Sequence, residues 1–150
     1  MNKQNKRPDY SDVKLLLNGS ELKQCSTFTY LGIQLDEFLT WDSHINVTCS
    51  KISKISGIMN NVKCILPPKL LFTMYNTFIL PHVMYCNVVW ASLHVSKLSR
   101  IHRLQKRALR ICANAHYLAP SLPLFRRFST LNVYDSNKLS IASLMHKFFT

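Results

Sequence analysis

The hydrophobic pattern of the chain changes its period near Trp41. Before this residue, short apolar runs flank Asn18-Gly19, a dipeptide typical of the type I′ turn of a β-hairpin. The next apolar run, "FTYLGIQLD", predicts a third strand, and Gly32 within it indicates a bend or the close approach of another backbone. We therefore expect a β segment over residues 13–36, preceded by a flexible lead-in over residues 1–12.

From Trp41 onward, apolar side chains recur every three or four residues, as on one side of an α-helix. Two shorter helices are expected in the following apolar stretch, because Pro81 should divide it. An amphipathic helix is expected along "SKLSRIHRLQKRALRICANA", and a last helix from about Asp135. The fold class predicted is α+β, mainly α, with a helical domain of four to five helices over residues 40–150. The first helical stripe consists of Trp41, Ile45, Thr48, Ile52, Ile55, Met59 and Val62.

The charge of +12 is concentrated in one part of the chain. The segment from Ser43 to Tyr134 holds 12 of the 19 Lys and Arg residues and no Asp or Glu. A block this one-sided repels itself unless a polyanion neutralises it. Nucleic acid is the commonest polyanionic partner, and an anionic membrane surface is the second.

The amphipathic helix concentrates this charge on one face. At about 100° per residue, its apolar side chains fall on one side and its basic side chains on the other. No aromatic residue interrupts the basic face, so we expect contacts with a duplex backbone and little reading of base sequence. The alternative is a solvated face that only aids solubility. The candidate nucleic-acid-binding residues are Lys97, Arg100, Arg103, Lys106, Arg107 and Arg110, with Lys51 and Lys54 on the preceding helix.

Three acids lie close together at Asp36, Glu37 and Asp42, and such a cluster could bind a metal. A solvated turn and the positive end of a helix dipole are sufficient to account for them, and we favour that structural interpretation. The pairs His82/Cys86 and Cys112/His116 have a spacing compatible with zinc, but five Cys and six His produce such pairs readily. No nucleophile or phosphate-loop motif is present. We therefore expect no catalytic residue, metal or cofactor in this chain.

The five cysteines are scattered, odd in number and without a CxxC pair, which is typical of reduced thiols in an intracellular protein. The polar N-terminus does not resemble a secretory signal, so we expect location in the nucleus or cytoplasm. The stretch from Leu70 to Leu93 carries no formal charge. Its polar residues and Pro81 favour buried helices over a membrane span, which is the less favoured alternative.

Four stretches occur in order along the chain: "FTYLGIQLD", "LTWDSHI", "PHVMYCNVVW" and "LQKRALRI". Together they resemble the primer-grip and thumb region in the C-terminal part of reverse transcriptases from non-LTR (LINE-type, jockey-like) retrotransposons. The resemblance covers about Val13 to Met145. The matching residues are Phe28, Tyr30, Leu31 and Gly32 in the primer-grip-like strand, Trp41, His44 and Ile45, then Pro81, Tyr85, Cys86 and Trp90, and finally Gln105, Lys106, Arg107, Ala108 and Arg110.

The resemblance implies a fragment of an RNA-directed DNA polymerase that binds an RNA–DNA or DNA template–primer duplex. The family's catalytic signature is an Ala-Asp-Asp strand turn in the palm, which uses Mg²⁺ and lies upstream of the primer grip. This chain has no Asp-Asp pair, so we expect it to be inactive alone and to have the palm and fingers as partners. The alternative is a remnant or domesticated protein-interaction module that docks through apolar surface.

Overall fold

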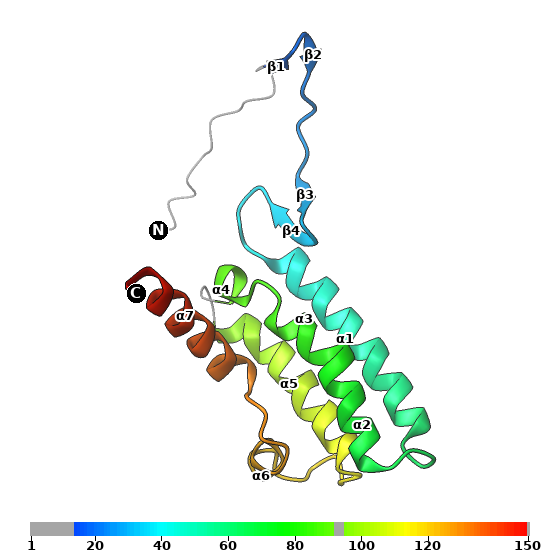
Figure 1. Ribbon diagram of the computed structural model, residues 1–150. Coiled ribbons are helices and arrows are strands. Elements are labelled where there is room, and N and C mark those ends of the chain that lie inside the picture. Colours follow the sequence, from blue (N-terminus) through cyan, green and yellow to red (C-terminus); the bar gives the residue numbers. More distant parts are fainter. Residues whose placement is uncertain (1–13, 92–94, 150) are drawn as a thin grey trace, which may run out of the picture.

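The computed structural model describes residues 14–91 and 95–149 (Figure 1). The lead-in expected over residues 1–12 lies outside these residues. The predicted fold class is confirmed, because short antiparallel strand pairs precede a mainly helical body. None of the helices in the described part of the chain combines the length and the apolar character that crossing a membrane requires.

Two separate hairpins form the β segment. Strands β1 (Leu16–Leu17) and β2 (Ser20–Glu21) pair around the predicted Asn18-Gly19 turn, where both residues have positive φ. The expected single third strand is wrong, because β3 (Thr27–Tyr30) and β4 (Ile33–Asp36) form a second hairpin. Its turn is Leu31-Gly32, with φ of 47° and 79°. Two consecutive positive φ angles match a type I′ turn, so Gly32 reverses the chain.

Helix α1 (Asp42–Val62) follows a loop organised by Asp36. The Asp36 carboxylate accepts hydrogen bonds from the backbone N–H of Phe38, Thr40 and Trp41 at 2.9–3.1 Å, and from the Thr40 hydroxyl at 3.1 Å. Trp41 itself is left-handed, with φ of 64°, and its indole is buried. The predicted stripe holds for much of α1, whose buried side chains are His44, Ile45, Thr48, Cys49, Ile52, Ser56 and Met59.

The predicted helix break at Pro81 is wrong. Helix α2 (Pro68–Met74), the π-helical segment η1 (Tyr75–Ile79) and α3 (Leu80–Met84) follow one another without a gap. The Leu80 N–H bonds to Tyr75 O, one residue further back than in an α-helix, and this wider turn accommodates the proline. The chain breaks later, at Cys86 with φ of 48°, before the short α4 (Asn87–Trp90).

Helix α5 (Val95–Cys112) is central to the body and contacts α1, α2, η1 and α7. Helices α6 (Leu122–Arg127) and α7 (Val133–Phe149) complete the fold. Figure 1 shows α1, the α2–α3 stretch and α5 side by side, with the hairpins extending beyond the start of α1. The core therefore lies between these helices, whereas every residue of β1 and β2 is exposed.

One buried side chain joins α5 to the start of α7. Gln105 is fully buried, and its amide nitrogen donates to the Tyr75 hydroxyl at 2.8 Å and to Leu131 O at 2.9 Å. Its amide oxygen accepts from the Val133 N–H at 3.0 Å. Because a buried amide needs partners for both ends, this arrangement fixes the loop before α7 against α5.

Candidate nucleic-acid interface

The packing of one side of α5 directs the basic residues of the opposite side outward. We call these residues the cationic face: Arg100, Arg103, Lys106, Arg107 and Arg110. Ile101, Ala108 and Leu109 are fully buried on the packed side. Arg100, Arg103 and Arg107 are exposed, and the other two residues are half-buried. Ten helical residues rise by about 15 Å, and a duplex carries one charge per about 1.7 Å of axis. The face is therefore long enough to lie along several phosphates.

Within the described residues, the structure places no carboxylate in salt-bridge contact with the cationic face. Arg100 Nη1 donates to Asn46 Oδ1 at 2.7 Å, and Arg110 Nε donates to Ala119 O at 2.9 Å. Both acceptors are neutral, so these bonds hold the guanidinium groups in place without cancelling their charge. The arginines thus keep the charge that a polyanion requires.

Lys97 is placed differently from the other candidates. Its ammonium forms an ion pair with Asp42 Oδ1 at 2.8 Å and donates to Thr40 O at 2.5 Å. Hydrogen bonding to Lys97 is the largest influence that lowers the pKa of the Asp42 carboxyl. Lys97 therefore ties α5 to the start of α1, a structural role that the sequence did not reveal.

Lys51 does not join the cationic face. Asn46 of α1 contacts Arg100, whereas Lys51 lies on another side of that helix, in a hollow of about 320 Å³. We call this the hairpin hollow, because Leu31 and Gly32 form part of its wall. Lys54 is exposed on α1. The remaining lining residues of the hairpin hollow are His44, Val47, Thr48, Pro81, His82 and Tyr85.

The primer-grip-like residues Phe28, Tyr30, Leu31 and Gly32 are all exposed on the β3–β4 hairpin. The Tyr85 hydroxyl donates to Leu31 O at 2.6 Å and anchors the hairpin turn to the helical body. A Cβ added to Gly32 would lie 3.9 Å from the Tyr85 ring, an ordinary contact. The positive φ, and not a lack of space, is therefore what favours glycine here.

Contacts link the first three of the stretches that carry the family resemblance. Trp90 Nε1 donates to Tyr85 O at 2.8 Å, and the Trp90 ring lies 5.5 Å from that of His44. The last stretch supplies Gln105, whose amide joins α5 to the loop before α7. Trp41, His44, Trp90 and Gln105 are buried, so these matching residues maintain the fold.

Asp36 and Asp42, two of the three clustered acids, have partners within the protein. Backbone hydrogen bonding by Thr40 is the main reason that the pKa of Asp36 lies below its usual range. Among the described residues, no group of three His, Cys, Asp or Glu side chains is arranged to hold a metal ion. Burial raises the pKa of the Cys112 thiol to about 12, so it is a core thiol.

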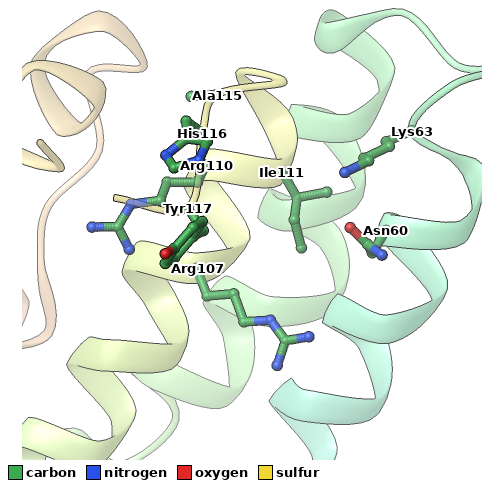
Figure 2. Close-up of a pocket in the computed structure, with 8 residues that line it drawn as sticks. All are labelled: Asn60, Lys63, Arg107, Arg110, Ile111, Ala115, His116 and Tyr117. Atoms are coloured by element: carbon green, nitrogen blue, oxygen red, sulfur yellow. The ribbon is translucent and has the colours of Figure 1, made fainter. Parts of the chain in front are cut away.

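A further hollow of about 420 Å³, which we call the end pocket, lies where α1 and α5 end (Figure 2). The sequence indicated Arg107 and Arg110 but not the residues that join them from elsewhere. No local signal marks these residues, because they come from the end of α1 and from the loop after α5. The lining residues are Asn60, Lys63, Arg107, Arg110, Ile111, Ala115, His116 and Tyr117.

No protein-family model matches the chain, and no curated protein or solved structure shows significant similarity to it. The resemblance to retrotransposon reverse transcriptases therefore stays a prediction.

Proposed function

We propose that this chain binds a nucleic-acid duplex through the cationic face of α5, as the primer-grip and thumb part of a non-LTR retrotransposon reverse transcriptase. The observation that carries the proposal is a row of exposed arginines on a helix whose other side is core. No acid occurs from Ser43 to Tyr134 to neutralise this row. Phosphates would supply the missing negative charge.

The contacts between the first three motif stretches also support the proposal. Residues far apart in sequence, such as Leu31 and Tyr85, or His44 and Trp90, contact each other directly. Under the proposal, the β3–β4 hairpin holds the primer strand and α5 lies along the duplex backbone. The catalytic aspartates and their Mg²⁺ belong to the palm, so this chain alone binds nucleic acid without polymerising it.

Equilibrium binding of a fluorescent RNA–DNA duplex tests the proposal. Replacing Arg100, Arg103, Arg107 and Arg110 with Glu should abolish binding, because four attractive contacts become repulsive. The matched control replaces four exposed lysines elsewhere with Glu, for the same change in net charge: Lys23, Lys69, Lys138 and Lys147. Loss of binding only in the first variant, with both circular dichroism spectra unchanged, is the expected result. Equal loss of binding in both variants would mean that binding depends on the net charge of the protein and not on the cationic face.

The end of α7 favours a second candidate function, which is docking of a protein partner. Its last turns expose large apolar side chains, with Phe148 77% and Phe149 83% exposed. Exposed apolar surface of this kind is typical of interaction sites. Sedimentation velocity at low and moderate salt distinguishes the two candidate functions. Self-association that does not change with salt concentration, in a chain that does not bind nucleic acid, would favour docking of a protein partner.

A further inference from the structure

The end pocket gathers basic and aromatic side chains from three segments of the chain. Lys63 follows α1, Arg107 lies on α5, and His116 and Tyr117 belong to the next loop. Figure 2 shows Lys63 and Asn60 reaching inward from the α1 side, and Arg107 extending toward α1 below them. We propose that this pocket binds one nucleotide, with its phosphate between Lys63 and Arg107 and its base on the ring of Tyr117.

The shape of the loop follows from how α5 ends. Asn114 is left-handed, with φ of 49°, and its N–H bonds to Ile111 O at 3.1 Å. The Ala115 N–H bonds back to Arg110 O at 2.9 Å. These two bonds form a Schellman motif, which reverses the chain at the end of a helix. The reversal brings His116 and Tyr117 beside the side chains of the last turns of α5.

Hydrogen bonds fix the loop in this position. Arg110 Nε donates to Ala119 O at 2.9 Å, and the Ala119 N–H bonds to His116 O at 2.9 Å. His116 Nδ1 accepts from the Leu118 N–H at 3.3 Å, so a neutral His116 carries its proton on Nε2. Nε2 can therefore donate to an anion. In Figure 2 Arg110 extends away from Lys63, which suits it to supporting the loop.

Tyr117 offers a ring for stacking. It is 73% exposed, and its ring centroid lies 4.5 Å from that of His116 at a tilt of 47°. An aromatic ring on the surface beside cations is the combination that single-stranded nucleic acids use, since each base has a π face and each phosphate a charge. The pocket volume of about 420 Å³ also lies within the roughly 300–1,000 Å³ typical of ligand sites.

Helix dipoles account for only part of this cluster. Cations are favoured at the negative C-terminal ends of helices, which explains Lys63 just after α1 and Arg110 in the last turn of α5. Arg107 lies before that last turn, so the dipole of α5 does not explain its position. Neither helix dipole explains the rings of His116 and Tyr117. Repulsion between Lys63 and Arg107 is relieved by an anion between them, and the described residues of the pocket include no acid.

A nucleotide site would extend the proposed function without depending on it. The cationic face tracks a backbone and has no stacking ring, whereas the end pocket has one. Arg107 belongs to both, so an unpaired nucleotide at the end of a bound duplex could occupy the pocket. The pocket is also accessible to a free mononucleotide, and the two sources share the same chemistry of phosphate and base.

Isothermal titration of the full chain with AMP, adenosine, inorganic phosphate and phenyl phosphate tests the site. AMP should bind more tightly than each of the other three, because only AMP supplies both a phosphate and a nucleobase. Lys63→Ala and Arg107→Ala should each weaken AMP binding about tenfold. Tyr117→Ala should weaken it at least about fivefold, and Tyr117→Phe should retain it. Lys69→Ala, which removes an exposed charge from α2, is the matched control.

Several results would overturn the inference. If phenyl phosphate binds as tightly as AMP, the pocket does not recognise the nucleobase. If Lys69→Ala weakens AMP binding as much as Lys63→Ala does, AMP binding depends only on the general positive charge of the protein.

A double variant separates this inference from the proposed function. Arg100→Glu with Arg103→Glu should lose duplex binding and keep AMP binding, because neither residue lines the pocket. AMP binding without duplex binding would thus refute only the proposed function. Duplex binding with no preference for AMP would refute only the nucleotide site.

A duplex with a single-stranded overhang distinguishes the two sources of the nucleotide. If the overhang tightens duplex binding only when Tyr117 is present, the pocket binds a nucleotide of the strand. If AMP binds but the overhang does not tighten duplex binding, the pocket binds free nucleotides.

Discussion

Helices α5 and α7 are similar in length, with 18 and 17 residues, but they use their surfaces in opposite ways. The apolar side of α5 is fully covered, as Ile101, Leu109 and Cys112 show. In α7 only Val133, Ser136 and Asn137 near its start are buried. Packing thus leaves charge exposed on α5 and apolar side chains exposed on α7.

The difference separates two kinds of binding. A charged face attracts a polyanion, and that attraction weakens as salt screens it. Apolar side chains such as Leu139, Phe148 and Phe149 gain from burial, which depends little on salt. Under the proposed function α5 binds nucleic acid, whereas a protein partner would bind α7.

Truncation of one leucine in each helix should give the largest difference in stability between α5 and α7. Leu109→Ala in α5 should lower the free energy of unfolding by about 2–5 kcal/mol, because it leaves a cavity in the core. Leu139→Ala in α7, where the side chain is 53% exposed, should change it by less than about 0.5 kcal/mol. Urea unfolding monitored by circular dichroism measures both. Equal losses would mean that α7 is covered in solution.

The link between the helices should be the next most sensitive point. Gln105→Leu keeps a similar volume but removes three hydrogen bonds, to Tyr75, Leu131 and Val133. A buried group left without a partner costs about 1–3 kcal/mol, and the Val133 N–H would be one. We expect a loss of at least that size in urea unfolding, with faster hydrogen exchange at the start of α7. An unchanged exchange rate there would show that the loop before α7 does not depend on Gln105.

A smaller, pH-dependent effect should come from His102, which lies between α5 and the start of α7. Its ring stacks on Phe125 at 5.9 Å and meets Tyr134 edge-on at 5.3 Å. Burial, with Lys106 adding to it, holds the His102 pKa below its usual 6.5, against the opposing influence of Gln105 and Asp135. The folded state thus favours the neutral ring, and its contribution to stability is present above pH 6.5.

Stability should therefore fall as the pH drops below about 6.5. Urea unfolding from pH 7 to 5 measures this fall, to which His44 and His82 also contribute because burial lowers their pKa values. His102→Phe keeps an aromatic ring and removes the titration, so it should make the fall shallower. A steeper fall in this variant would reverse the sign of the argument.

The sequence was sufficient where the determining signal is local. The Asn18-Gly19 turn and the two faces of α5 follow from dipeptide preference and from helical period. Pro81 was misleading, because the helix widens at Tyr75–Ile79 and the break falls at Cys86, whose positive φ no residue pattern marks. Leu31 is likewise an unusual residue for the first position of a type I′ turn, so the second hairpin was missed.

The candidate site was predicted only in part, for the same reason. Arg100 to Arg110 form one face because a helix is periodic. The structural role of Lys97 was not predictable, because the sequence does not show that Asp42 lies beside it. The end pocket was not predictable either, because Lys63 lies far from Arg107 in the sequence and the loop after α5 must fold back to bring Tyr117 to them. Such meetings depend on tertiary packing, which a single sequence does not display.

The salt dependence of duplex binding tests the central claim most directly. The logarithm of the binding constant for an RNA–DNA duplex should fall linearly with the logarithm of salt concentration, with a slope near −0.9 for each phosphate contacted on B-form DNA. Arg103→Ala with Arg107→Ala should make the slope shallower by roughly two, because two contacts are lost. Leu139→Ser in α7 should leave it unchanged. A flat dependence in the wild-type chain, or an equal change from the α7 variant, would contradict the assignment of nucleic-acid binding to the cationic face.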